Sequence, residues 1–176
     1  MSKQNALHKL IFRSNLYNGT LQEKKTKSIS KIQIKTFPGN IEIGNQIFQG
    51  KFLLSGYNID LRNKLPWKMN TSNDWKKDFH SFFWLHHLRA TNTISASKFS
   101  QTIIKKWIKE YNHWDEFTWK ISLVSRRIES WILNYNFLIR EAEQEFIDIL
   151  YNSICRQSKH LLRWHSLNNN STDQIQ

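Results

Sequence analysis

The stretch Ser95–Asn112, SASKFSQTIIKKWIKEYN, decides the fold class of this chain. Its large apolar residues follow one another at intervals of four, one, three, one and three positions: Phe99, Ile103, Ile104, Trp107, Ile108 and Tyr111. This spacing gathers them on one face of an α-helix, because residues three and four apart share a face at 3.6 residues per turn. We therefore expect an amphipathic helix that begins at Ser95 or Ser97 and ends near Asn112.

The same periodicity recurs on both sides of this stretch. It predicts one helix over residues 73–90, with Ser72 as its N-cap, and another over residues 119–135. A fourth helix begins near Glu141 and carries basic residues in its last turns, where the helix dipole favours them. Because the connections are short, we expect residues 72–167 to form consecutive antiparallel helices. Residues 168–176 are polar and predict a flexible tail.

Residues 31–67 show a different pattern. Ile32 and Ile34 alternate with polar residues, which predicts a strand, and Pro38-Gly39 marks a turn. Residues 41–54 alternate apolar groups with glycines, which is typical of short strands and turns. We therefore expect a short β-like segment ahead of the helices.

Residues 1–30 are expected to hold a short amphipathic helix over residues 4–17, followed by a basic linker. The first 18 residues contain no apolar core of a signal peptide, and no stretch approaches the roughly 18 apolar residues that span a bilayer. The sequence thus predicts no membrane association and a cytoplasmic protein, or a periplasmic one if the true start lies upstream. Cys155 is alone, which excludes an intramolecular disulfide.

The charge of the chain is strongly positive. Twenty-six Lys and Arg against 14 Asp and Glu give a net charge of +12. This balance favours an anionic partner such as nucleic acid, an acidic polysaccharide or a membrane surface, although solvated surface lysines explain it equally well. Clustering of Lys24, Lys25, Lys27, Lys105, Lys106 and Lys109 on one surface would favour a binding module.

Motifs for nucleotide, hydrolase and zinc-protease sites are missing from the sequence, so we expect no cofactor. His80, His86 and His87 are close in sequence, but no carboxylate or Cys joins them at a ligand spacing, and we expect no metal. Arg127 follows Arg126, and Arg suits bidentate capture of a carboxylate or sulfate; a structural ion pair with Glu129 is the alternative.

Tryptophan is abundant, with eight residues in the chain. An exposed indole stacks on a sugar ring or a base, and core packing is the alternative for each of them. Trp84 and Trp119 are candidates because each belongs to a longer motif.

Four stretches, taken in order, resemble helices of the bacterial heparinase II/III family. They are WKKDFHSFFWLHHL at 75–88, Trp107-Ile108 with Trp114-Asp115, Trp119 with SRRIESWI at 125–132, and RQSKHL at 156–161. Residues 49–52 with Pro66-Trp67 resemble the family's preceding segment. The likeness covers residues 37–165, with Ser81 standing where the family often has Gly.

This resemblance implies a fold and a function. Family members form an incomplete α/α toroid followed by a β-sandwich-like domain, and they are similar to lyases that cleave acidic glycans by β-elimination. The catalytic Asn, Tyr and His of the family lie in later helices and beyond, so no catalytic residue is carried over. Trp84, Trp119 and Arg127 match motif positions, and the resemblance implies that they line the substrate cleft.

We therefore expect a mainly α chain that forms the first part of an incomplete α/α toroid, preceded by the short β-like segment. The implied function is that of the N-terminal part of a polysaccharide lyase, inactive alone because the catalytic part is missing. Its partners are then an acidic polysaccharide and the missing C-terminal part. The alternatives are a small basic module that binds nucleic acid or acidic polysaccharide, and a subunit of a split lyase.

Overall fold

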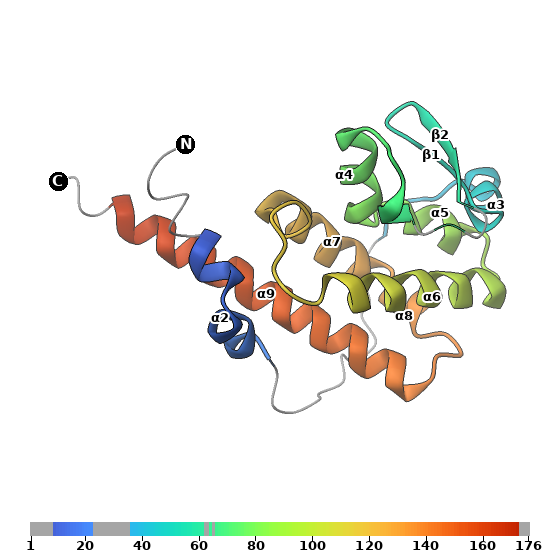
Figure 1. Cartoon of the computed structure of the whole chain (residues 1–176). Coiled ribbons are helices and arrows are strands. Elements are labelled where there is room, and N and C mark those ends of the chain that lie inside the picture. Colours follow the sequence, from blue (N-terminus) through green and yellow to red (C-terminus); the bar gives the residue numbers. More distant parts are fainter. Residues whose placement is uncertain (1–8, 23–35, 62–63, 65, 173–176) are drawn as a thin grey trace.

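The computed structural model describes residues 9–22, 36–61, 64 and 66–172, and the described chain is mainly helical (Figure 1). Its helical part consists of α4 (Asn73–Ser81), α5 (Leu85–Ala90), α6 (Ile94–Tyr111), α7 (Ile121–Leu133), α8 (Tyr135–Leu138) and α9 (Gln144–Thr172), with a short 3-10 turn at Pro66–Lys68 before them. The expected mainly α class is confirmed. Among the described residues, no helix is long and apolar enough to cross a bilayer.

The predicted helix over residues 73–90 is divided in two at Phe82. This residue adopts a left-handed backbone conformation, with φ of 57°, and its amide donates to the carbonyl of Phe79. Its ring is fully buried, and its carbonyl accepts a 2.6 Å hydrogen bond from the Ser130 hydroxyl on α7. Burial of the ring thus holds a conformation that a bulky residue seldom adopts.

The expectation of strands over residues 41–48 is wrong, because Ile41–Phe48 forms helix α3. The Asn40 side chain caps this helix by accepting from the Ile43 amide at 3.0 Å. Gly44 does not mark a turn. It lies where α3 packs against α5, and a Cβ at this position would stand 2.3 Å from the carbonyl oxygen of His87.

The β-like segment is confirmed in part by a hairpin of β1 (Lys51–Leu54) and β2 (Tyr57–Asp60), which pair antiparallel. Both residues of its turn, Ser55 and Gly56, have positive φ, as tight hairpin turns require. Phe52 anchors the hairpin, since its buried ring contacts the rings of Phe79 and Trp84. The strand predicted at Ile32 and Ile34 lies outside the described residues.

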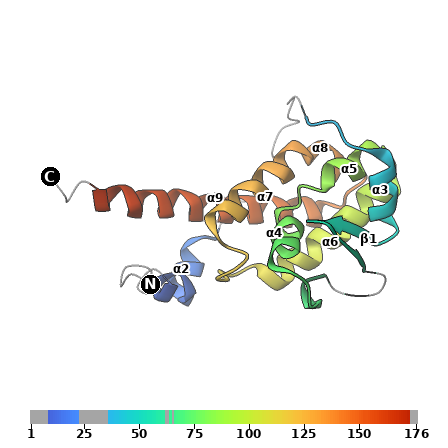
Figure 2. The ribbon, with the colours of Figure 1, turned by 90° about the horizontal axis from the view of Figure 1, so that it is seen from above.

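The two ends of the described chain meet. Residues 9–13 are helical, and α2 (Asn15–Thr20) follows with Ser14 as its N-cap, so the helix predicted over residues 4–17 is interrupted. Figures 1 and 2 show α2 beside the C-terminal half of α9. Helix α9 continues to Thr172, so the expectation of a flexible tail from residue 168 is wrong up to that point. The linker at residues 23–30 lies outside the described residues.

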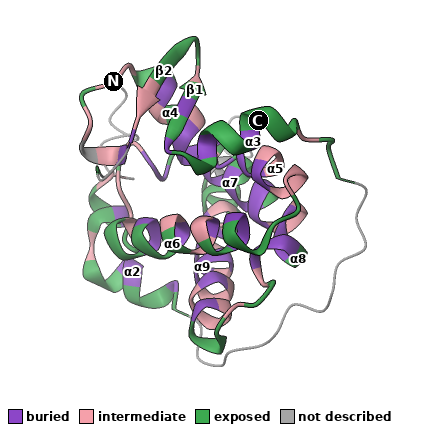
Figure 3. Ribbon diagram, turned by 90° about the vertical axis from the view of Figure 1, so that its right-hand side faces the viewer, coloured by how far each residue is buried: buried purple, intermediate pink, exposed green. Residues whose placement is uncertain are grey.

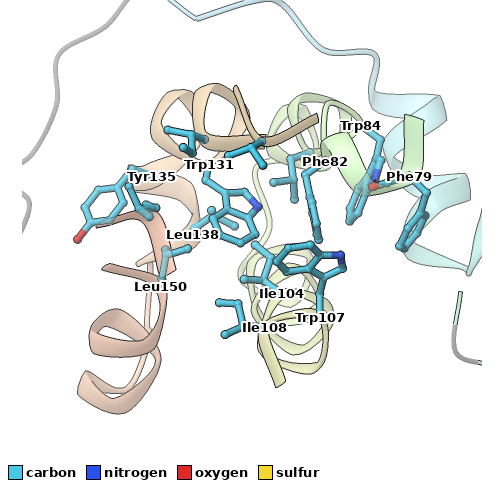
Figure 4. Packing of buried hydrophobic residues seen from close by; sticks show 14 of the residues in the cluster. Phe79, Phe82, Trp84, Ile104, Trp107, Ile108, Trp131, Tyr135, Leu138 and Leu150 are labelled. Carbon is cyan, nitrogen blue, oxygen red and sulfur yellow. Dashed lines mark hydrogen bonds between the residues drawn. The ribbon is translucent and has the colours of Figure 1, made fainter. Parts of the chain in front are cut away.

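The core lies between α4, α6, α7 and α9, and Figure 3 shows buried positions on their facing sides. Trp107 and Trp131 cross at its centre with ring planes 85° apart, and Phe82 meets both (Figure 4). These large rings fill the space that the helices enclose, as expected for edge-to-face aromatic packing.

Candidate functional site

Arg127 is fully buried and is held by three hydrogen bonds. Its Nε donates to Oε1 of Gln157 at 2.7 Å, and its two terminal nitrogens donate to the carbonyls of His80 at 3.1 Å and Thr118 at 3.0 Å. The guanidinium also lies 4.2 Å from the ring centroid of Trp107. Burial lowers the pKa of Arg127 to about 9, so the side chain stays charged at neutral pH. Oxygen dipoles and an aromatic face therefore solvate this charge.

His80 stands beside this arginine and is neutral. Nδ1 of His80 accepts a 2.9 Å hydrogen bond from the indole nitrogen of Trp107, which leaves the ring proton on the other nitrogen. Burial, with a smaller contribution from the charge of Arg127, lowers the pKa of His80 to about 3. His80 is thus a structural acceptor inside the core.

His160 forms a second buried polar contact. Its Nδ1 lies 2.7 Å from the hydroxyl of Tyr17, and its ring meets Trp119 edge-on. Burial lowers the pKa of His160 to about 4 and raises that of Tyr17 to about 12. Arg156, one turn earlier on α9, donates to the carbonyl of Asn18 at 3.1 Å. These contacts attach α2 to α9.

Residues from the four stretches at 75–88, 107–115, 119–132 and 156–161 therefore meet in one region of the core. Each stretch contributes a buried polar or aromatic group: His80, Trp107, Trp119, Arg127, Gln157 and His160. Hydrogen bonds among His80, Trp107, Arg127 and Gln157 join α4, α6, α7 and α9, whereas Trp119 bonds to the carbonyl of Tyr111 and His160 to Tyr17. The adjacent Arg126, which takes no part in this network, is exposed.

The three predicted substrate-binding residues are all buried in this chain. Trp84 and Trp119 have 2% of their surface exposed and Arg127 has none. The indole nitrogen of Trp84 donates to the carbonyl of Phe79 at 3.1 Å, and that of Trp119 to the carbonyl of Tyr111 at 3.1 Å. Core packing accounts for these residues, and their role in substrate binding stays a prediction.

A surface cleft of about 490 Å³ lies next to Trp119. Residues from three segments line it: Lys9 and Phe12, then Trp114, Glu116, Trp119, Lys120, Ile121 and Ser122, then His160 and Trp164. We call it the tryptophan cleft. Phe12, Trp119 and His160 are buried and form its floor, while Glu116, Lys120 and Trp164 are exposed.

Positive charge surrounds the one carboxylate in the tryptophan cleft. Glu116 receives a short hydrogen bond from Nζ of Lys9 and lies 3.2 Å from the guanidinium of Arg13. The hydrogen bond from Lys9 and the charges of Lys9, Arg13 and Lys120 lower the pKa of Glu116. Three cations thus share one anion, which leaves a net positive charge at this surface.

A second groove, of about 640 Å³, runs between α3, the hairpin and α5. Trp84 touches it, and so do His86, His87 and Arg126. Nδ1 of His87 accepts from the Asn40 amide at 3.0 Å, and burial lowers its pKa to about 4. Within the ranges that the structure describes, no group of three or more His, Cys, Asp or Glu is placed to hold a metal ion.

The sequence analysis did not predict the tryptophan cleft, because the residues that line it are far apart in the chain. Lys9 and Glu116 are separated by 107 positions, and no periodicity or motif connects them. The motif Trp114-Asp115 was the available signal, but it does not say which tryptophan reaches the surface. Comparison with models of known protein families, with curated proteins and with solved structures gives no significant match to this chain.

Proposed function

We propose that this chain is the N-terminal helical part of a heparinase II/III-like polysaccharide lyase and helps to hold an acidic glycan. The observation that carries the proposal is the network around Arg127. Each of the four stretches that resemble the family supplies one of its side chains: His80, Trp107, Arg127 and Gln157.

The arrangement of the helices is compatible with the first part of a toroid. Helix α9 contacts both α6 and α7, and α7 also contacts α4. In the C-terminal half of α9, which lies beside α2 (Figure 2), Leu162 and Leu167 are exposed. A following pair of helices in a toroid would cover such apolar positions.

The groups for β-elimination are proposed to come from outside this chain. Elimination needs a base beside C5 of the uronate and a group that neutralises its carboxylate. His80 and His160 have suitable chemistry, but both are buried and bonded to Trp107 and Tyr17. His80 is 3% exposed, and His160, in the floor of the tryptophan cleft, is 1% exposed with its Nδ1 bonded to Tyr17, so this part is proposed to bind without cleaving.

The test is calorimetric titration of the purified chain with tetrasaccharides of galacturonate, guluronate, mannuronate and glucuronate-containing heparosan. The methyl esters of the same tetrasaccharides are the matched controls, because they keep the rings and lose the charge. We expect at least one acid to bind more than tenfold more tightly than its ester, with no unsaturated product by ultraviolet absorbance. Equal binding of acid and ester, or turnover by this chain alone, would contradict the proposal.

Nucleic-acid binding remains the alternative. Lys24, Lys25 and Lys27 lie outside the described residues, and Lys105 is paired with Glu145 at 2.6 Å. Lys105, Lys106 and Lys109 are all exposed on α6, whereas the grouping of the six lysines on one surface stays untested. Tighter binding of single-stranded oligothymidylate than of every uronate tetrasaccharide, at the same ionic strength, would favour the alternative.

A further inference from the structure

The tryptophan cleft has the size and walls of a sugar site. Its volume of about 490 Å³ falls within the range of about 300–1,000 Å³ that is usual for small-ligand sites. Trp114 and Trp164 reach it from the connector before α7 and from α9. A pyranose ring presents an apolar face of C–H groups, which packs well against an indole.

The charges of the cleft suit an acidic ring that also carries hydroxyl groups. Lys120 is exposed at the cleft with its Nζ 5.2 Å from the ring centroid of Phe117, whereas Lys9 forms an ion pair with Glu116. A ligand carboxylate would therefore meet Lys120 first, and the hydroxyls of the ring would find an acceptor in Glu116. The net positive charge of the cleft favours binding of an anion.

We propose that the tryptophan cleft binds one uronate residue of an acidic glycan, with its ring against Trp114 and Trp164. Its carboxylate lies at Lys120 and its hydroxyl groups lie at Glu116. This inference rests on the function proposed above, and it assigns that function to a defined site. It also moves the predicted sugar contact from the buried Trp119 to the two tryptophans beside it.

A glycan fits the cleft better than a nucleic acid does. Each pyranose offers several hydroxyl donors to Glu116, whereas the phosphodiester backbone of DNA offers acceptors only.

The N-terminal segment completes this site. Lys9 and Phe12 belong to residues 9–13, and α2 fixes this segment on α9. The hydrogen bond between Tyr17 and His160 and that between Arg163 and the carbonyl of Thr20, at 3.1 Å, provide the attachment. Lys9 and Phe12 are about 100 positions from Trp114 and Glu116 in the sequence. Their place in the wall of the cleft therefore depends on the docking of α2 on α9.

The experiment compares Lys120→Glu with Lys98→Glu in the intact chain, using whichever of the four tetrasaccharides binds best to the unaltered protein. Both lysines are exposed and both changes alter the net charge equally. Lys98 lies 13 residues before the end of α6, about 20 Å from the connector that carries the cleft. We expect at least a tenfold loss of affinity for Lys120→Glu and less than a twofold loss for Lys98→Glu.

A second variant tests the aromatic wall. Trp114→Ala should reduce the affinity at least fivefold, and circular dichroism checks that the variant is folded. Lys120→Arg should retain most of the affinity. Equal losses in Lys120→Glu and Lys98→Glu would overturn the cleft assignment while leaving the proposed function intact. No uronate binding by the unaltered chain would instead refute the proposed function.

Discussion

The indole nitrogen of Trp107 donates a 2.9 Å hydrogen bond to Nδ1 of His80, and the guanidinium of Arg127 lies 4.2 Å above the same indole. One tryptophan thus joins a neutral imidazole and a buried cation. The hydrogen bond requires the neutral form of His80, because Nδ1 must keep its lone pair. This relationship makes the core of the protein sensitive to acid.

Acid should destabilise the fold in a defined pH range. The pKa values of His80 and His160 fall from 6.5 to about 3 and about 4 on folding, so the unfolded chain binds more protons below pH 6.5. Stability is therefore fully present above pH 6.5 and declines as the pH falls toward 4. The loss is about 1.4 kcal/mol per pH unit for each histidine over that range. Urea unfolding at pH 7.5, 5.5 and 4.5 measures it, and an unchanged midpoint would contradict the neutral assignment.

Replacement of Arg127 should destabilise the protein far more than replacement of its neighbour. Arg127→Met leaves the carbonyls of His80 and Thr118 buried without this donor, at an expected cost of about 3 kcal/mol. Arg126→Met alters an exposed side chain of the same type and should cost less than about 0.5 kcal/mol. Urea unfolding monitored by circular dichroism compares them, and similar values for both variants would argue against the network.

Two glycines should respond to alanine in opposite directions. In Gly44→Ala the new Cβ would stand 2.3 Å from the carbonyl oxygen of His87, so α3 and α5 must move apart, at a cost of about 1–3 kcal/mol. In Gly19→Ala the Cβ meets no atom within 4 Å, and the helical position should gain up to about 1 kcal/mol. Thermal melting of both variants gives the two signs. Stabilisation by Gly44→Ala would show that this close helix contact does not exist.

Loss of the Tyr17 hydroxyl should loosen the N-terminal segment. Tyr17→Phe removes the 2.7 Å contact with His160 and leaves Nδ1 of that buried ring unpaired, which costs about 1–3 kcal/mol. Tyr57→Phe, at an exposed position in β2, is the control and should be nearly neutral. Hydrogen exchange of the α2 amides detects the change directly. Unaltered protection in Tyr17→Phe would mean that other contacts hold α2.

The helical class could be predicted from periodicity, because apolar residues spaced three and four apart, as on α6, share one face only in an α-helix. It failed at two places for physical reasons. The left-handed Phe82 interrupts a continuous apolar pattern, since burial of its ring decides the backbone there. At Gly44, the glycine that suggested a turn serves a close contact between helices, and only the packed structure reveals the neighbour.

The position of the tryptophan cleft could not be predicted from the sequence. Tryptophan and cationic residues were expected to hold an acidic sugar, but the sequence could not distinguish the buried Trp119 from the more accessible Trp114. Lys9 is separated from Glu116 by more than 100 residues in the sequence. The docking of α2 on α9 brings the two side chains together. Long-range tertiary contacts of this kind leave no local pattern.

The most direct measurement is the affinity of the purified chain for a uronate tetrasaccharide and for its methyl ester, at one ionic strength. We predict that the acid binds at least tenfold more tightly than the ester and that Lys120→Glu removes this preference. Binding of neither sugar, or equal binding of both, would contradict acidic-glycan recognition by this chain.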